Sequence, residues 1–256
     1  MNSRLSLSAV LITKNAAGRL EDCLASLAFC DEIVVVDSGS EDGTEAIARR
    51  HGARVIQSDW RGFGPQKQFA VEQASHDWVL CIDADERVSR SLQEGIRTVL
   101  AAVPPAPTSG AYRFARCNRF MGRYLRHGEG YPDWSLRLFD RRAARWSDDP
   151  VHERVIATGE IGTLQGDLLH ESAESLESYL AKQNRYSSLA ADAALASGER
   201  ATALHLVLSP LLRFVKFYVF RLGFLDGLPG LVHILIGCAA SFAKYAKMLA
   251  FQRSAQ

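Results

Sequence analysis

The first hundred residues of the chain alternate between short apolar runs and helical segments, and this alternation constrains the fold more than any other feature. The clearest run, Glu32–Asp37, is apolar and β-branched between its charged ends, as expected for a buried strand. Buried strands separated by helices are typical of a parallel sheet with helices on both faces. The sequence therefore predicts an α/β fold with strands at residues 7–12, 32–37, 53–56 and 78–83 and helices at residues 19–29, 44–51 and 67–74.

The composition and the predicted secondary structure change twice in the rest of the chain. A proline-rich break at residues 103–107 ends the first part, because proline cannot continue a helix. The next segment is rich in arginine and aromatic residues and carries strand patterns at residues 111–114 and 136–139. From Ser175 onward the pattern is helical again. We expect one large domain over residues 1–172, made of two halves (1–103 and 108–172), followed by a helical region over residues 173–256.

Charge and cysteine content narrow the choice of partners and compartment. The formal net charge is +1, which gives no electrostatic reason to expect nucleic acid as a partner. The five cysteines show neither a CxxC pair nor the spacing of metal ligands, so free thiols in a reducing compartment are expected. The first residues lead directly into an apolar strand without the core of a signal peptide. These features predict a cytoplasmic location.

Two of the expected strands end in aspartate, at Asp37 and Asp83. Ligands of open α/β sheets bind outside the carboxyl ends of the strands, so both carboxylates are candidates for ligand contact. Asp83 and Asp85 flank one small residue, and carboxylates at this spacing can point the same way and suit Mg²⁺ or Mn²⁺. The alternatives are solvated loop carboxylates at Asp83 and Asp85, and ordinary turn and cap residues after Asp37.

Three motifs in register resemble those of family 2 glycosyltransferases, which have the GT-A fold. They are Thr13-Lys14-Asn15 after the first strand, the Asp37-Ser-Gly-Ser stretch after the second, and Asp83-Ala-Asp85-Glu86 after the fourth. The resemblance implies a nucleotide-sugar donor and a Mg²⁺ or Mn²⁺ cofactor. It further implies that Asp37 binds the nucleobase with Thr13 and Asn15, that Asp83 contacts the ribose, and that Asp85 binds the metal with Asp83 beside it. Lys67 is a further candidate for the nucleotide site, with a solvated helix lysine as the alternative.

The middle and end of the chain resemble a narrower group, the bacterial lipopolysaccharide inner-core glucosyltransferases. The residues that carry this resemblance are Tyr131–Phe139, His152-Glu153, Leu169-His170, Gly64–Gln68 and Gly223–Gly227. The resemblance implies transfer of a hexose, glucose from UDP-glucose, to a lipid-linked saccharide acceptor with inversion at the anomeric carbon.

An inverting transfer needs a carboxylate that deprotonates the acceptor hydroxyl. The resemblance places Glu153 in that role, although His152-Glu153 departs from the commoner Glu-Asp form of the motif, and Asp133 is the reserve base. Arg137 could hold the diphosphate with its fork of donors. By resemblance, His170 would bind the metal or the diphosphate. Surface carboxylates, ion pairs or a structural histidine are the alternatives for these positions.

The C-terminal helical region contains two apolar runs, residues 204–220 and 228–243, followed by Lys244, Lys247 and Arg253. Short apolar helices flanked by cations fit an interfacial attachment to anionic lipid. We therefore expect peripheral association with the inner-leaflet surface of the inner membrane. The alternative is a hairpin packed on the catalytic domain or in the interface of a homo-oligomer.

Three other functions compete with this one. A polyprenyl-phosphate glycosyltransferase would share the N-terminal motifs but needs little base assistance, so Glu153 would be dispensable. A nucleotidyltransferase of similar fold would carry a glycine- and arginine-rich loop after the first strand, and residues 13–19 do not match that loop. A non-catalytic sugar-nucleotide-binding scaffold is disfavoured by the intact Asp37, Asp83 and Asp85.

Overall fold

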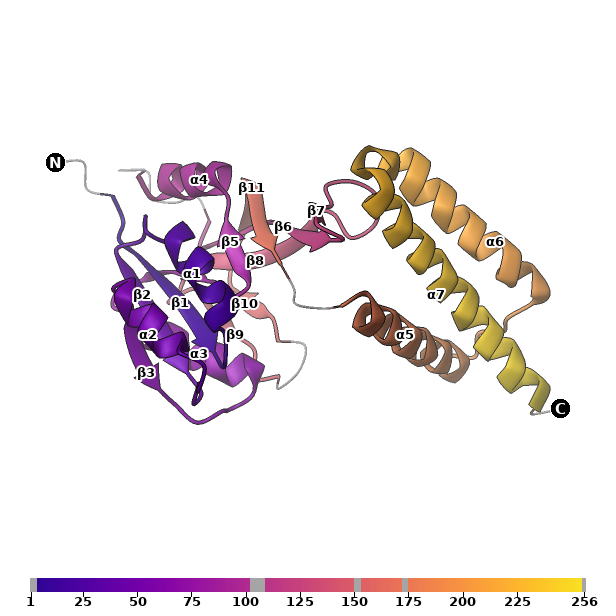
Figure 1. Ribbon diagram of the computed structural model, residues 1–256, viewed down its shortest axis with the longest axis horizontal. Helices are drawn as coiled ribbons and strands as arrows, with labels where there is room; N and C mark the ends of the chain where they lie inside the picture. Colours follow the sequence, from indigo (N-terminus) through magenta and orange to yellow (C-terminus); the bar gives the residue numbers. More distant parts are fainter. Residues whose placement is uncertain (1–3, 102–108, 150–152, 172–174, 255–256) are drawn as a thin grey trace. The chain divides into compact units, whose positions relative to one another are not determined.

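The structure is a computed structural model that describes residues 4–101, 109–149, 153–171 and 175–254 (Figure 1). The chain divides into two compact units. The first comprises Met1–Cys117 and Asp133–Glu171, and the second comprises Asn118–Pro132 and Ser172–Gln256. The expected break at 103–107 and the expected boundary between residues 172 and 173 lie outside the described residues. Residues 118–132, which the sequence placed in the catalytic half, group with the C-terminal helices.

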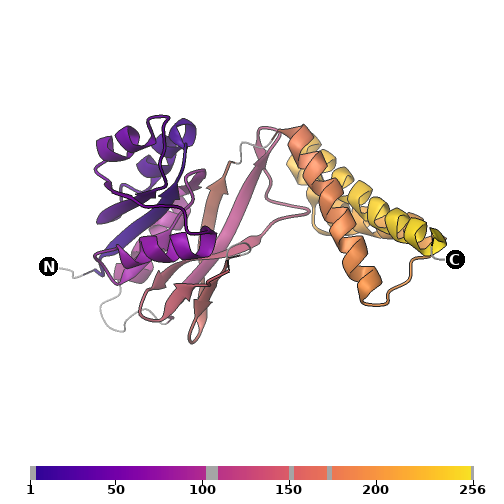
Figure 2. The same ribbon diagram turned by 90° about the horizontal axis from the view of Figure 1, so that it is seen from below.

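A mixed sheet forms the centre of the first unit (Figure 2). β1 pairs in parallel with β2 and β4, and β2 pairs in parallel with β3. The β4–β8, β8–β6 and β11–β5 pairs are antiparallel. Across the sheet the order is β3 (Arg54–Gln57), β2 (Glu32–Asp37), β1 (Leu7–Thr13), β4 (Trp78–Cys81), β8 (Asp133–Asp140), β6 (Ala111–Phe120), β11 (Ile161–His170) and β5 (Glu86–Val88).

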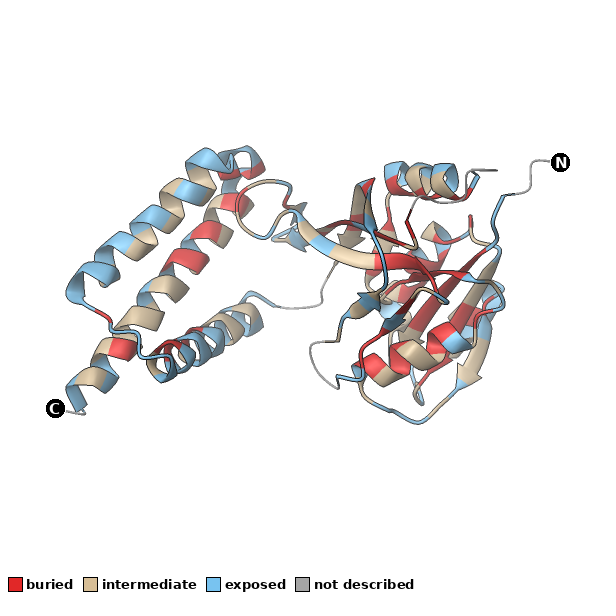
Figure 3. Cartoon of the chain, turned by 180° about the vertical axis from the view of Figure 1, so that it is seen from behind, coloured by how far each residue is buried: buried red, intermediate tan, exposed pale blue. Residues whose placement is uncertain are grey.

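Both faces of this sheet are covered, because alternate side chains of the central strands point to opposite sides. On one face, buried β1 residues such as Leu7 and Leu11 pack with α1 (Ala17–Ser26), α2 (Thr44–Arg50) and α4 (Arg90–Ala101). On the other face, Val10 packs with α3 (Phe63–Glu72) and with the β9 (Ala144–Trp146) and β10 (Val155–Ala157) ribbon. Figure 3 shows the buried residues concentrated in these layers.

The predicted mainly parallel α/β core is confirmed. The differences lie in element lengths and in elements not expected from the sequence, namely α4, β5, β9, β10 and β11. α3 begins at Phe63 rather than at residue 67, because Pro65 lies in the first helical turn, where its missing N–H is not needed. β6 runs to Phe120 rather than ending at residue 114. Arginines interrupt the apolar pattern of this strand. Their side chains are bound by neighbours, because Arg113 donates to Thr163 and Arg116 binds Asp133.

Three long helices form most of the second unit (Figure 1). They are α5 (Leu176–Ala196), α6 (Ala203–Phe214) and α7 (Gly227–Ser254), and α7 contacts both of the others. α6 continues into a π-helical stretch, Val215–Phe220, and a 3₁₀ turn, Gly223–Asp226, leads into α7. β7 (Arg123–Tyr124) forms a tight hairpin with the end of β6.

Two segments of this unit are long and apolar enough to cross a membrane by length and composition, Ala203–Phe220 and Gly223–Ser254. The first has none of its residues buried, and 39% of the residues in the apolar 18-residue window of the second are buried. The buried core helix of a water-soluble protein meets the same criteria of length and composition.

Candidate active site

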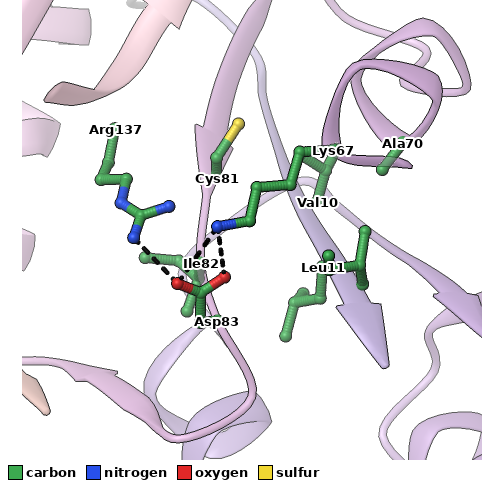
Figure 4. Close-up of a pocket in the computed structure, with 9 residues that line it drawn as sticks. Val10, Leu11, Lys67, Ala70, Cys81, Ile82, Asp83 and Arg137 are labelled. Atoms are coloured by element: carbon green, nitrogen blue, oxygen red, sulfur yellow. Dashed lines mark hydrogen bonds and ion pairs between the residues drawn. The ribbon is translucent and has the colours of Figure 1, made fainter. Parts of the chain in front are cut away.

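Lys67, Asp83 and Arg137 converge beyond the carboxyl end of β4 (Figure 4), and Glu153 joins them through Lys67. The Lys67 ammonium lies 3.0 Å from Asp83 Oδ1 and 2.9 Å from Glu153 Oε1. From the other side, Arg137 donates from Nη2 to Asp83 Oδ2 at 2.8 Å. Two cations thus face two carboxylates at the edge of the sheet where ligands of such folds bind.

The fold brings these side chains from four separate elements. Asp83 follows β4, Lys67 lies in α3, Arg137 lies in β8, and Glu153 precedes β10. The approach of the Glu153 segment to α3 depends on Gly64. A Cβ at Gly64 would stand 2.6 Å from the backbone oxygen of Asp149 and still closer to that of Ser147. Only glycine therefore fits where this segment crosses α3. His152, the neighbour of Glu153 in the motif, lies outside the described residues.

The charges of this cluster shift one another's proton affinities. Burial alone would raise the pKa of Asp83, but Arg137 and Lys67 hold it well below its ordinary value. Burial raises the pKa of the neighbouring Glu86, with Arg137 opposing the effect and the charge of Asp83 reinforcing it. Asp83 is consequently an anion held by two cations. Glu86 is the carboxyl group of this cluster that resists ionisation.

Trp146 forms the wall behind both cations. Its ring centroid lies 4.8 Å from Lys67 Nζ and 5.3 Å from Arg137 Cζ, within the range of cation–π attraction. The indole Nε1–H donates to Cys81 Sγ at 3.3 Å, which fixes the ring against β4. A buried ring in this place orients the two cations toward Asp83 without adding a competing charge.

Asp37 forms a second polar cluster at the end of β2, beside Thr13 at the end of β1. Thr13 donates to Asp37 Oδ2 at 2.7 Å, Ser40 donates to the same oxygen at 2.5 Å, and the Gly39 and Ser40 amides donate to Oδ1. Burial would raise the pKa of Asp37, but these hydrogen bonds outweigh it and lower the pKa. Asn15 has a positive φ of 51° and accepts from the Glu41 amide, so it shapes the same loop.

Asp85 and His170 form a third pair, with 3.3 Å between Asp85 Oδ2 and His170 Nε2. The antiparallel pairing of β11 with β5 brings them together, because His170 lies opposite Glu86 and the Glu171 amide donates to Asp85 O. A carboxylate and an imidazole are suitable ligands for Mg²⁺ or Mn²⁺ that also takes oxygens from a diphosphate. Among the described residues, no three His, Cys, Asp or Glu side chains converge as a metal cage, and the Asp83 carboxylate faces Lys67 and Arg137 instead.

Asp133, the reserve base, lies outside these clusters. Its carboxylate is bound by Arg116, with 2.8 Å between Nη2 and Oδ2. Arg116 and Asp133 are register partners on β6 and β8, so this ion pair follows from the sheet itself.

Two contributors to the site were not assigned a role from the sequence. Glu86 belongs to the Asp-Ala-Asp-Glu motif, but its full burial and its hydrogen bond from the Asp83 amide depend on a tight turn that the motif does not reveal. Trp146 sits in a basic stretch with no motif around it. The one available signal was its isolation as an aromatic residue between polar neighbours, which is weak evidence.

Comparison with known proteins decides the family. The protein-family model for Glycosyl transferase family 2 matches residues 8–155, more than half of the chain. The chain belongs to glycosyl transferase family 2. Family 2 membership and the mixed sheet with flanking helices agree on a glycosyltransferase of the GT-A fold.

Family 2 relatives of known sequence align along nearly the whole chain. The lipopolysaccharide core biosynthesis glycosyltransferase LpsC of Rhizobium meliloti is 35% identical over 100% of this chain and 95% of its own length. An uncharacterized glycosyltransferase of Rickettsia typhi is 31% identical over 94% of this chain and 86% of its own length. Among solved structures, S. aureus TarS 1-349 in complex with UDP-GlcNAc aligns with a TM-score of 0.51 and 16% identity, over 98% of this chain and 93% of that one. At this identity the likeness supports the fold alone.

Proposed function

We propose that this family 2 glycosyltransferase transfers a hexose, glucose from UDP-glucose, to a lipid-linked saccharide acceptor of the lipopolysaccharide core with inversion. The observation that carries the proposal is the meeting of Lys67, Asp83, Arg137 and Glu153 at the carboxyl edge of the sheet. The full-length similarity to LpsC, a lipopolysaccharide core biosynthesis glycosyltransferase by name, supports the choice of acceptor.

In the proposed mechanism, the donor binds across the carboxyl ends of β1, β2 and β4. The Asp37 carboxylate binds the nucleobase. Thr13 orients this carboxylate through the 2.7 Å hydrogen bond, and Asn15 shapes the adjacent loop. Asp83 accepts from the ribose hydroxyls. Lys67 and Arg137 stabilise the negative charge that develops on the departing diphosphate.

Glu153 acts as the base in this mechanism. Its carboxylate takes the proton of the acceptor hydroxyl while the hydroxyl oxygen bonds to the anomeric carbon and the bond to the diphosphate breaks on the opposite side. Lys67 binds Glu153 at 2.9 Å, so a diphosphate that attracts Lys67 would leave the carboxylate available to the acceptor. Asp133 is bound by Arg116 and remains the second choice as base.

Asp85 and His170 would hold the divalent cation, Mg²⁺ or Mn²⁺. Bound there, the cation would supply Lewis-acid neutralisation of the diphosphate. Metal binding is testable without turnover, because Mn²⁺ binding in the presence of UDP can be followed by electron paramagnetic resonance. We expect Asp85→Ala and His170→Ala to weaken it, and unchanged binding in both variants would remove them as ligands.

We further propose that the C-terminal helices attach the enzyme to the inner-leaflet surface of a membrane, where a lipid-linked acceptor would be found. The two apolar segments Ala203–Phe220 and Gly223–Ser254 support this attachment.

The central experiment measures UDP release from a panel of UDP-sugars with detergent-solubilised core lipopolysaccharide or with polyprenyl phosphate as the acceptor. Metal-dependent release with UDP-glucose and the core acceptor, lost in Glu153→Gln, is the expected result. Release that needs polyprenyl phosphate and survives Glu153→Gln would identify a polyprenyl-phosphate glycosyltransferase instead. Donor binding without release under any condition would favour a sugar-nucleotide-binding scaffold.

A further inference from the structure

α6 and the segment after it present apolar side chains outward along their whole length. Leu204, Val207, Leu212 and Phe220 are 64%, 65%, 64% and 78% exposed. Figure 3 shows α6 as exposed or intermediate throughout. A helix of a water-soluble protein buries its apolar stripe, whereas α6 buries no residue and leaves its valine and most of its leucines exposed.

Two polar side chains of α6 face inward, toward α7 and toward Glu129. Ser209 of α6 and Ser241 of α7 lie 2.8 Å apart, Oγ to Oγ. Arg213 of α6 binds Glu129, and Gly237 of α7 leaves the room for this ion pair, since a Cβ there would collide with the Glu129 carboxylate. Polar contacts between helices and apolar side chains outside are the arrangement expected when the surrounding medium is lipid.

Cations gather where α6 turns into α7. Segments 118–132 and 213–228 carry six Lys and Arg residues but only two carboxylates. Both carboxylates are bound inside the unit, Glu129 by Arg213 and Asp226 by the His127 amide at 2.7 Å. The exposed cations are Arg119, Arg123, Arg126, Lys216 and Arg221.

The region where α6 turns into α7, called the α6–α7 corner, also carries exposed apolar side chains. Phe220, Leu222 and Leu225 are exposed, and Leu222 holds this position with a positive φ of 55°. The β6–β7 hairpin is fastened to the corner by the Arg123 guanidinium, which donates to Leu225 O at 3.0 Å. At the tip of the hairpin, Met121 is also exposed with a positive φ of 47°. Exposed apolar side chains in the same segments as exposed arginine and lysine match a bilayer surface with anionic headgroups.

We propose that the α6–α7 corner, defined as residues 119–126 and 216–228, together with the outer face of α6, is a docking surface for anionic phospholipid. The apolar side chains enter the acyl region, and the surrounding cations bind the headgroup phosphates. This inference rests on the proposed membrane attachment and assigns its residues and its lipid charge preference. A second copy of the chain fits the corner less well, because the same exposed cations on the two copies would face and repel each other.

The test is flotation of the full-length protein with vesicles of phosphatidylcholine alone or of equal parts phosphatidylcholine and phosphatidylglycerol. We expect binding to the anionic vesicles that weakens as salt is raised. Phe220→Glu/Leu225→Glu should abolish it, and Arg119→Gln/Lys216→Gln should weaken it by about fivefold for each charge removed. Ile161→Glu, which places one such charge on an exposed apolar residue of the first unit, should bind as wild type.

Three outcomes would overturn the proposal. These are wild-type protein that floats with neither vesicle, equal binding to neutral and anionic vesicles, and a Phe220→Glu/Leu225→Glu variant that still floats. A wild-type dimer in detergent that becomes monomeric in this variant, with no vesicle binding by either protein, would assign the surface to a second copy. UDP-glucose binding measured on the same samples reports the first unit separately, so failure of the donor proposal is distinguishable from failure of the lipid surface.

Discussion

The Lys67 ammonium lies 2.9 Å from the Glu153 carboxylate and joins α3 to the segment that precedes β10. The same ammonium lies 3.0 Å from Asp83 Oδ1. One cation is therefore shared between the proposed ribose ligand and the proposed base. Removing the Glu153 carboxylate and removing the Lys67 cation should therefore affect different steps: proton transfer in the first case and donor binding in the second.

Glu153→Gln is expected to lower kcat by about 10²–10⁴-fold, the usual contribution of a general base. Binding of UDP-glucose should be nearly unchanged, since glutamine keeps the shape of the side chain and Lys67 retains Asp83 as a partner. Turnover measured by UDP release and affinity measured by calorimetry separate the two effects. Glu160→Gln, at an exposed position in the same region, serves as the control. A Glu153→Gln variant with wild-type kcat would exclude this residue as the base.

Lys67→Met is expected to weaken donor binding by about 10–100-fold, the effect of losing a hydrogen bond to a charged group. Methionine fills the space against Trp146 but leaves Asp83 with Arg137 as its remaining cationic partner. The dissociation constant of UDP-glucose measures this effect directly. Lys244→Met, in α7, removes a lysine from the second unit and should leave donor affinity as it is. Equal affinities of wild type and Lys67→Met would show that this lysine does not contact the diphosphate.

Gly64→Ala is expected to impair activity by displacing the Glu153 segment, because the added Cβ meets the backbone oxygens of Ser147 and Asp149. Backbone cannot move aside as a flexible side chain does, so we also expect a stability loss of about 1–3 kcal/mol. Gly18→Ala in α1 has open space around its Cβ and should be neutral or slightly stabilising. Denaturant unfolding of both variants makes the comparison. Equal stability of the two variants would show that the Ser147 and Asp149 backbone does not need a glycine at position 64.

The sequence predicted the α/β core and named all four residues of the main cluster as candidates, for different reasons. Strand ends such as Asp83 follow from apolar runs, and Lys67 and Glu153 followed from resemblance to family motifs. What could not be predicted is which charges share a partner. The Lys67–Glu153 contact joins residues 86 positions apart in the chain, and neither propensity nor periodicity carries information over that separation.

The predicted metal ligands illustrate the same limit. Asp83 and Asp85 were expected to face one metal, because residues i and i+2 in an extended chain face the same way. His170 was expected at the metal or the diphosphate by resemblance alone. In the structure the chain turns after Asp83, where the Glu86 amide donates to Asp83 O, and the two carboxylates find different partners. A local spacing argument could not include the cations on α3 and β8 that hold Asp83.

Glu32 gives a prediction for the pH dependence of folding. Its carboxylate accepts from Ser8 at 2.6 Å, from the Ser75 amide and hydroxyl at 2.8 Å, and from Arg54 at 3.0 Å. Burial alone would raise its pKa, but these hydrogen bonds lower it from 4.5 to about 2. Since the folded pKa lies below the unfolded one, the stabilisation is fully present above pH 4.5 and is lost as the pH falls toward 2.

Glu32→Gln should therefore cost about 1–3 kcal/mol of unfolding free energy at pH 7. The difference from wild type should shrink between pH 5 and 2, because the protonated glutamic acid and glutamine are then alike in charge. Urea unfolding followed by circular dichroism across this pH range measures both curves. Glu94→Gln removes a carboxylate that is 65% exposed and paired with Arg90, and should change stability by less than about 0.5 kcal/mol. A Glu32→Gln penalty that stays constant with pH would mean that lost packing, rather than lost charge, causes the destabilisation.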